Sequence, residues 1–236
     1  MTPPLALDID GTLTRPHGDG VDPRVFEVLP EWDAPVVLTT GKAFPYPVSL
    51  CHFLGIPERA VAENGGVVLV DDQLTYTGDR ERARSAVEEY KSRGGALGWG
   101  AADTVNRWRE TEVAVHVDGD ETLLREVAAD HGLEVYDTGY AYHVKTPGVS
   151  KGDGLTTAAE VLGLDVREFV AIGDSENDVT TFEVVGTSYA VSNADERAKE
   201  SADTVLDDAH MDGTLAALAD LEGGQAVLDR VESTER

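Results

Sequence analysis

Short apolar runs alternate with helical segments in the N-terminal part of the chain. The runs predict buried strands, and the segments between them predict helices. In chain order the expected elements are a strand at 5–7, a helix at 23–31, a strand at 35–39, a helix that begins at Pro45, a strand at 60–63 and a hairpin at 67–77. Strands that alternate with helices are typical of a parallel sheet flanked by helices, so we expect an α/β fold.

The pattern changes at about residue 80. The sequence then predicts, in order, a charged helix at 80–93, a glycine-rich stretch at 94–100, a strand at 113–117, a helix at 120–131 and strands at 133–136 and 141–145. These elements make up a small α+β unit. We therefore expect a separate domain over residues 80–147, inserted into a larger domain that consists of residues 1–79 and 148–236.

The parallel pattern resumes at Ser150, which we expect to cap a helix over 151–162. A strand at 169–172 and a last strand at 188–191 precede short helices, and residues 229–236 predict a frayed tail. The chain has 236 residues, of which 41% are hydrophobic. This length fits either one domain with a large insertion or two small domains.

Acidic residues outnumber basic ones by 45 to 19, and the formal net charge of −26 is spread over the whole chain. Such a charge repels nucleic acid and anionic lipid surfaces, and it resembles the composition of proteins from salt-loving organisms. The sequence contains no membrane-spanning run and no signal-like segment at the N-terminus, so we expect a cytoplasmic protein that does not bind membranes. The lone Cys51 is expected to pack inertly in the interior.

Two carboxylates, Asp8 and Asp10, follow the first apolar run and are followed by Gly11. Because the chain bends at this glycine, both carboxylates can face one space, which suits a metal ion and a nucleophile. An ordinary turn is the alternative interpretation. A calcium loop is disfavoured, because residues 13–16 do not supply the further oxygen ligands that such a loop needs.

A second acidic motif, residues 173–178, follows another predicted strand and carries Asp174 and Asp178. In open parallel sheets ligands bind beyond the carboxyl ends of the strands, so this motif, the first one, Thr40 and Lys151 are expected to meet at one edge. Carboxylates, a hydroxyl group and a lysine make a consistent set for phosphoryl transfer with Mg²⁺. An aspartate there can act as nucleophile and form an aspartyl-phosphate.

These motifs, residues 8–12, 40–42, 151–152 and 173–178, resemble in order the four motifs of the haloacid dehalogenase superfamily of phosphatases. The resemblance implies a Rossmann-like core, a parallel sheet flanked by helices, with the inserted unit as an α/β cap of the Cof-like branch. Residues 63–66 also resemble a turn seen there. The short cap and the overall length are most similar to the archaeal phosphoglycolate phosphatases.

The resemblance assigns a role to each motif residue. It implies that Asp8 is the nucleophile and a magnesium ligand. Asp10 is implied to be the general acid and base, and to give its backbone carbonyl to the metal. Thr40 and Lys151 are implied to hold the phosphoryl oxygens.

In the fourth motif, Asp174 is implied to bind Mg²⁺ directly. Asp178 and Asn177 are implied to complete the environment of the metal and the lysine, and Gly41 is a supporting residue of the second motif. Lys42 departs from the arginine that many relatives carry, which leaves open whether it contacts phosphate or solvent.

The resemblance implies a magnesium-dependent phosphomonoester hydrolase acting on a small phosphorylated metabolite, with 2-phosphoglycolate, cleaved to glycolate and phosphate, as the first candidate. A sugar phosphatase of the sucrose-phosphate or mannosyl-phosphoglycerate type and a phosphomutase are alternatives with related chemistry. A non-catalytic metabolite-binding module on the same fold is an alternative of another class, and so is an acidic interaction protein. The sequence fits a monomer or a homodimer equally well.

Some polar residues of the inserted unit have simpler interpretations. Asp120 and its acidic neighbours are expected to form a turn and a helix cap rather than a metal site. Arg107, Arg109, His143 and Lys145 could reach a substrate carboxylate, but for each of them we expect a place on the solvated surface of the cap.

Overall fold

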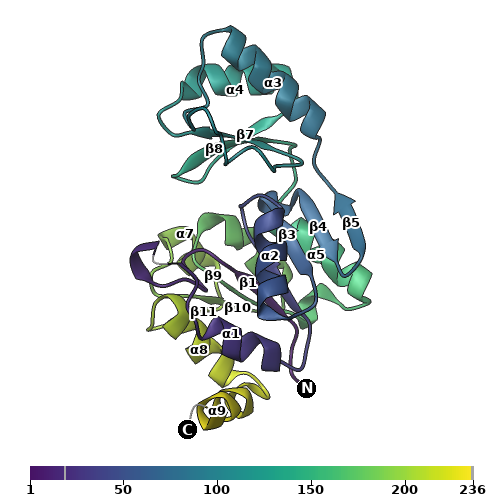
Figure 1. Ribbon diagram of the computed structural model, residues 1–236, viewed down its shortest axis with the longest axis vertical. Coiled ribbons are helices and arrows are strands. Elements are labelled where there is room, and N and C mark those ends of the chain that lie inside the picture. The colour runs from purple at the N-terminus through teal and green to yellow at the C-terminus, as the bar shows by residue number, and fades with distance from the viewer. Residues whose placement is uncertain (19, 235–236) are drawn as a thin grey trace.

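The computed structural model describes residues 1–18 and 20–234, and in this part of the chain the strands form two separate sheets (Figure 1). The larger sheet and its helices form the lower part of the molecule in Figure 1, where both termini also lie. The smaller sheet and two helices stand above it. The inserted unit therefore lies at the opposite end of the molecule from the termini.

The larger sheet has the strand order β11-β10-β9-β1-β2-β3-β4-β5 within the described residues. The strands from β11 to β3 run parallel, and the β4–β5 hairpin adds to this edge in antiparallel orientation. Their bounds are β1 Leu5–Asp8, β2 Val36–Thr39, β3 Arg59–Ala62, β4 Val67–Val70, β5 Gln73–Tyr76, β9 Val170–Gly173, β10 Thr187–Ala190 and β11 Thr204–Val205. The expected α/β fold and the hairpin are confirmed.

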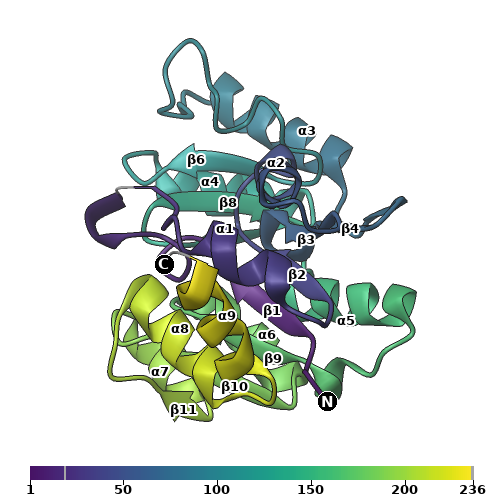
Figure 2. The ribbon, with the colours of Figure 1, turned by 60° about the horizontal axis from the view of Figure 1, so that its bottom comes forward.

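Helices cover both faces of this sheet, which explains why its central strands are buried along their whole length and apolar up to their last residues. Helices α5 and α6 pack together on one face, and α1, α2, α8 and α9 lie on the other (Figure 2). Their bounds are α1 Val25–Val28, α2 Pro45–Leu54, α5 Lys151–Leu162, α6 Val179–Val184, α7 Glu196–Ser201, α8 His210–Asp220 and α9 Gly224–Thr234. Cys51 of α2 is fully buried in this core, as expected.

The inserted unit is an antiparallel sheet with the order β6-β8-β7, covered by two helices on the side away from the larger domain (Figure 1). Its elements are α3 Arg80–Ser92, β6 Val113–His116, α4 Glu121–Asp130, β7 Glu134–Asp137 and β8 Ala141–Lys145. The side chain of Asp120 accepts a hydrogen bond from the backbone of Leu123 and caps α4, as expected. The helices shield one face of this sheet, so its other face is directed towards the larger domain.

Two apolar clusters form, one on each sheet. Every buried member of the smaller cluster lies between Ala83 and Val144, and no buried member of the larger one, among the described residues, lies between Val70 and Leu155. We therefore propose two domains, one made of residues 1–79 and 148–236 and the other of residues 80–147. The separate cores support this division. The described helices include none that is long and apolar enough to span a membrane.

Two expectations for the C-terminal region are wrong. The strand at 188–191 is not the last, because the exposed two-residue strand β11 pairs with β10. A strand this short and polar has no periodic pattern that a sequence analysis could detect. The tail expected at 229–236 is helical as far as Thr234, and residues 235–236 lie outside the described residues.

Candidate active site

The motif residues meet at the carboxyl edge of the larger sheet. Asp8 is the last residue of β1 and pairs in register with Thr39, so Thr40 follows directly beyond β2. Asp174 follows β9 on the other side of β1, and Lys151 begins α5. The predicted convergence of these segments is therefore observed.

Lys151 is buried and connects two of the acidic residues. Its ammonium group lies 2.7 Å from Oδ1 of Asp8 and 2.7 Å from Oδ1 of Asp178. Burial alone would lower the pKa of Lys151, but Asp178 and Asp8 outweigh it and raise the pKa above its ordinary value. The lysine therefore carries a permanent positive charge between these carboxylates. Ser150 caps the same helix by accepting a hydrogen bond from the backbone of Asp153.

Asp8, Asp174 and Asp178 form a carboxylate cluster in which one oxygen of each lies within 4.8 Å of the others. Burial raises the pKa of Asp8 well above its ordinary value, and it raises that of Asp174 to about 7, with Asp178 adding to both shifts. Oδ2 of Asp8 is buried without a hydrogen-bond partner among the described residues. Crowded carboxylates with an unpartnered oxygen have the chemistry of a divalent metal site.

The turn after β9 fixes Asp178. Its Oδ2 accepts hydrogen bonds of 3.1 Å from the backbone N–H groups of both Asp174 and Ser175. A Cβ atom on Gly173 would lie 2.5 Å from the Asp178 carboxyl carbon, so only glycine leaves room for this arrangement. Asp178 is therefore held by the backbone on one oxygen and by Lys151 on the other.

Asp10 lies apart from the carboxylate cluster. Its side chain is half-exposed, and its two oxygens lie 2.9 and 2.8 Å from the ammonium group of Lys42. The Asp10 carboxylate is thus separate from the carboxylate cluster, and its implied proton transfer and backbone contact with a metal stay predictions. Lys42 faces the candidate site rather than solvent alone, and its contact with phosphate also stays a prediction.

The second motif is a partly buried loop that contacts the inserted unit. The hydroxyl oxygen of Thr40 accepts a hydrogen bond of 3.0 Å from the backbone N–H of Lys42. The carbonyl of Gly41 accepts one of 3.0 Å from Nη1 of Arg109. A Cβ atom on Gly41 would lie 2.9 Å from Oδ1 of Asn64, so the loop is closely packed. Its position therefore depends on residues of both domains.

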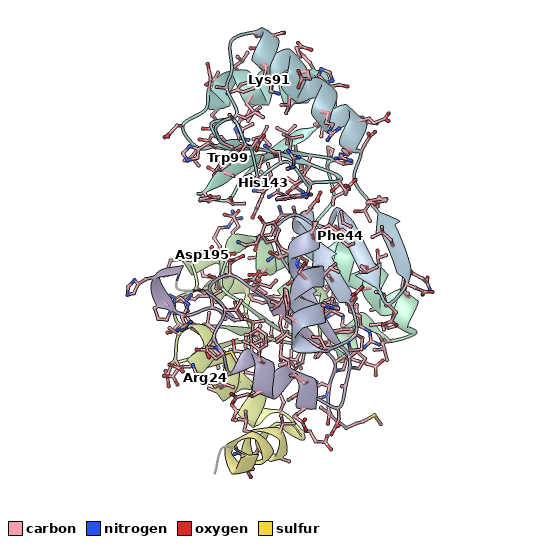
Figure 3. The ribbon with its side chains drawn as sticks, in the orientation of Figure 1. Arg24, Phe44, Lys91, Trp99, His143 and Asp195 are labelled. Carbon is pink, nitrogen blue, oxygen red and sulfur yellow. The ribbon has the colours of Figure 1, made fainter. Side chains whose placement is uncertain are left out.

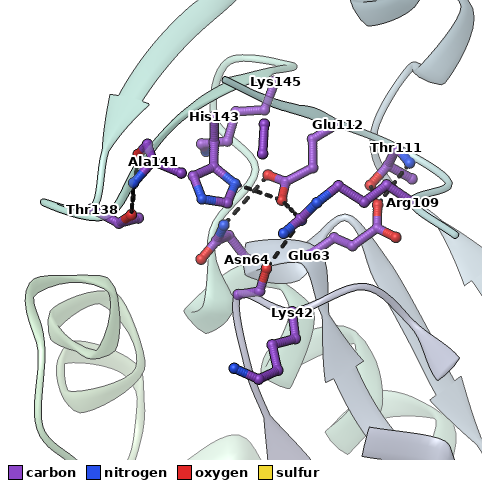
Figure 4. Close-up of polar contacts among 12 residues, drawn as sticks. Lys42, Glu63, Asn64, Arg109, Thr111, Glu112, Thr138, Ala141, His143 and Lys145 are labelled. Atoms are coloured by element: carbon purple, nitrogen blue, oxygen red, sulfur yellow. Dashed lines mark hydrogen bonds and ion pairs between the residues drawn. The ribbon is translucent and has the colours of Figure 1, made fainter. Parts of the chain in front are cut away.

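Glu112 is the centre of a polar network between the two domains (Figure 4). It pairs with Arg109, its Oε1 lies 2.7 Å from Nδ1 of His143, and its Oε2 accepts a hydrogen bond of 3.3 Å from Asn64. Burial would raise the pKa of Glu112, but His143 and Arg109 outweigh it and lower the pKa to about 2. Oδ1 of Asn64 in turn accepts a hydrogen bond of 3.3 Å from Asn177 in the fourth motif.

The expectation that cap cations lie on the solvated surface is wrong for three of the four. Arg109, His143 and Lys145 are buried, and only Arg107 is exposed. His143 lies on the face of the inserted unit that is directed towards the larger domain (Figure 3). No sequence pattern singles out Glu112. The alternation of strand side chains along residues 141–145 does predict that His143 and Lys145 share one face.

Residues 63–65 form a tight turn at the junction of the domains. Glu63 and Asn64 have left-handed backbones, with φ of 52° and 53°, and Gly65 has φ of 98°. The buried Glu63 carboxylate accepts hydrogen bonds from the backbone N–H groups of Glu110 and Thr111. This strained turn therefore serves as an anchor for the loop that carries Arg109 and Glu112.

A cavity of about 420 Å³ lies between the domains, beside the carboxylate cluster. The larger domain lines it with Ser150, Lys151 and Asn177, and the inserted unit lines it with Tyr136 and Lys145. Asp8 is not among the lining residues, so the cavity adjoins the cluster on the side of Lys151. Its size suits a small molecule.

The chain is similar to known proteins in sequence and in fold. Residues 120–218 match the family model described as haloacid dehalogenase-like hydrolase. The chain is 65% identical to the phosphoglycolate phosphatase of Halorubrum lacusprofundi, over 94% of this chain and 98% of the relative. It is 55% identical to that of Natronomonas pharaonis, over 92% of this chain and 97% of the relative. A solved structure from Thermoplasma acidophilum superposes with a TM-score of 0.76 at 26% identity, covering 90% of this chain and 95% of that one.

Proposed function

The chain belongs to the haloacid dehalogenase-like hydrolase family, and we propose that it is a magnesium-dependent phosphatase that hydrolyses 2-phosphoglycolate to glycolate and phosphate. The observation that carries the proposal is the buried Lys151, which bridges Asp8 and Asp178 beside the carboxylate cluster. The cluster supplies a metal site, and Asp8 supplies a nucleophile. Relatives that share more than half of the sequence and nearly all of its length are named phosphoglycolate phosphatase, which supports the substrate.

In the first step a carboxylate oxygen of Asp8 attacks the phosphorus atom, and the bond from phosphorus to the ester oxygen breaks. Asp10 donates its proton to this leaving oxygen, so glycolate departs as an alcohol. Lys151 and the hydroxyl of Thr40 balance charge on the phosphoryl oxygens. When bound, Mg²⁺ adds positive charge beside these oxygens, and Asp8, Asp174, Asp178 and the backbone carbonyl of Asp10 would hold it.

In the second step Asp10, now ionised, takes a proton from a water molecule. The water oxygen attacks phosphorus, and the bond between phosphorus and Asp8 breaks, which releases phosphate and regenerates the carboxylate. Asp10 suits both proton transfers because its side chain lies outside the metal cluster and is held by Lys42 alone among the described side chains. The loop that carries Thr40 and the turn that carries Asp178 are both fixed by hydrogen bonds, so the groups are pre-positioned.

A substrate panel tests this proposal. Phosphate release is measured for 2-phosphoglycolate, sucrose 6-phosphate, mannosyl-3-phosphoglycerate and hexose phosphates, with Asp8→Asn as the inactive control. We expect 2-phosphoglycolate to have the highest kcat/KM and Asp8→Asn to lower it by at least about 10³-fold. If a sugar phosphate is hydrolysed faster than 2-phosphoglycolate, the sugar phosphate is the substrate instead. Isomerisation without phosphate release would indicate a mutase. Equal rates for Asp8→Asn and the wild type would refute the mechanism.

Metal dependence is tested separately. Treatment with EDTA is expected to abolish phosphate release, and Mg²⁺ to restore it. Added Mg²⁺ is also expected to raise the melting temperature of the wild type but not of Asp174→Asn, because a ligand that binds only the folded state stabilises it. A metal-free enzyme that retains full activity would contradict this part of the proposal.

A further inference from the structure

The open face of the smaller sheet presents polar side chains to the cavity. In the register of β7 and β8, Glu134 lies opposite Lys145 and Tyr136 lies opposite His143. Their neighbour Val144 points to the other face and packs in the apolar cluster under α3 and α4. Because strand side chains alternate, the sheet carries one apolar face and one polar face, and the polar face adjoins the candidate active site.

Lys145 is a buried cation on this face. Its side chain is 9% exposed, its ammonium group lies 2.8 Å from the carboxylate of Glu134, and it also donates to the carbonyl of Val149. The ammonium group lies 5.8 Å from the centre of the Tyr136 ring. Both Lys145 and Lys151 line the same cavity, so two basic side chains border one space, one from each domain.

The carboxylate that pairs with Lys145 is replaceable. The side chain of Glu134 is 43% exposed, so it can turn into solvent at little cost when another carboxylate takes its place. Tyr136 also lines the cavity, and among the described residues its ring faces the ammonium group of Lys145 while its hydroxyl forms no side-chain hydrogen bond. Burial, with Glu176 nearby, raises the pKa of Tyr136 to about 12, so the phenol is a donor at neutral pH.

We propose that Lys145, with Tyr136, binds the carboxylate of the substrate, and that Glu134 occupies this place in the substrate-free protein. This inference rests on the proposed function and names the groups that select its substrate. The protein as a whole repels anions, since its net charge is −26, so selective binding of an anionic metabolite needs a local cation. A carboxylate attracts a buried ammonium group more strongly than an exposed one.

Arg197 is the other cation of the cavity besides the two lysines, among the described residues. Its side chain is 69% exposed and pairs with Glu176. Solvent screens a contact with such a group, so Arg197 contributes little selectivity. The burial of Lys145 therefore makes it the specificity-determining residue.

The test compares two phosphate esters that differ in the carboxylate. Kinetic constants are measured for 2-phosphoglycolate and for ethyl phosphate, in which a methyl group replaces the carboxylate. The variant is Lys145→Gln with Glu134→Gln, which removes the ion pair without changing net charge or leaving an unpaired carboxylate. The matched control is Lys91→Gln with Glu88→Gln, an exposed pair at 2.8 Å on α3.

The Lys145 double variant is expected to raise KM for 2-phosphoglycolate by about tenfold or more, with KM for ethyl phosphate changed less than about twofold. The control variant leaves both constants unchanged. A purely structural role of Lys145 through Val149 would change KM equally for the two esters, and that result would overturn the inference. A double variant that prefers 2-phosphoglycolate as strongly as the wild type does would also overturn it. If the wild type itself does not prefer 2-phosphoglycolate over ethyl phosphate, the proposed substrate fails, and the inference fails with it.

Discussion

A Cβ atom placed on Gly11 would lie 1.9 Å from Oδ2 of Asp174. Gly11 also has φ of 83°, a conformation that glycine adopts most readily, and its backbone N–H donates a 2.9 Å hydrogen bond to the hydroxyl of Thr14. The turn after β1 therefore leaves space for a carboxylate that belongs to the turn after β9. Through this contact the two acidic motifs form one site.

Gly11→Ala is expected to lower kcat/KM by at least about 10²-fold and to weaken metal binding, because the new methyl group displaces Asp174. Gly20→Ala is the matched control, since Gly20 has φ of 85° but no described atom within 4 Å of a Cβ. Both variants carry a similar backbone strain of about 1–2 kcal/mol. Activity titrated against Mg²⁺, with thermal unfolding in parallel, separates displacement of Asp174 from backbone strain. An equal loss of activity in Gly11→Ala and Gly20→Ala would contradict the prediction.

Lys151→Met removes the cation that pairs with two buried carboxylates, Asp8 and Asp178. In the absence of metal we expect it to destabilise the protein by about 3–5 kcal/mol, because breaking a buried ion pair leaves charges uncompensated. Added Mg²⁺ is expected to restore part of the stability but not the activity. Lys199→Met is the control, because its ammonium group lies 3.8 Å from an exposed glutamate. Urea unfolding with and without Mg²⁺ measures these effects. If the metal-free Lys151→Met variant is as stable as the wild type, Lys151 does not compensate the charge of the buried carboxylates.

The sheet edge and its acidic residues could be predicted because local rules determine them. A buried parallel strand is apolar along its whole length, and the polar residues that follow it must lie at its carboxyl end. This rule predicts the positions of Asp8 and Asp174, and the residue type of Ser150 predicts the helix cap that the structure shows. The pairing of Lys151 with two carboxylates is a contact that only the fold shows, and its implied contact with phosphoryl oxygens stays a prediction.

The contacts between the domains could not be predicted in the same way. The sequence shows that Arg109 and His143 are basic residues, but only the fold places Glu112 between them and buries all three side chains. Likewise, nothing local indicates that Lys42 pairs with Asp10, which is 32 residues away. The contacts of Glu112 depend on how the two sheets meet, and the pair of Lys42 and Asp10 depends on how the loops after β1 and β2 lie beside each other. Both are set by long-range packing rather than by periodicity.

Asp10→Asn is expected to separate the two chemical steps. With p-nitrophenyl phosphate the leaving group needs no proton, so Asp8 can still be phosphorylated. The second step lacks its base, and the aspartyl-phosphate accumulates. Rapid mixing is therefore expected to show a burst of about one p-nitrophenolate per enzyme followed by slow turnover, and no burst with Asp8→Asn. Unchanged steady-state turnover of Asp10→Asn would show that another group activates the water.

The Glu112 network links cap stability to pH. Because Arg109 and His143 hold the pKa of Glu112 at about 2, below its ordinary 4.5, the ionised carboxylate stabilises the folded state above about pH 4.5. This contribution, on the order of 3 kcal/mol, is lost as the pH falls from 4.5 towards 2. Glu112→Gln is therefore expected to be less stable at pH 7 and to lose less stability over that range.

Unfolding in urea at molar salt, repeated from pH 7 to pH 2, measures the effect of Glu112. Glu121→Gln is the control, because Glu121 pairs with Arg125 at 2.7 Å on a half-exposed helix surface, where such a pair contributes about 0.5 kcal/mol or less. A stability curve for Glu112→Gln that runs parallel to the wild type below pH 4.5 would show that the network does not hold the carboxylate ionised. If Glu112→Gln also weakens phosphate binding, the contact from Arg109 to Gly41 transmits the change to the loop of Thr40.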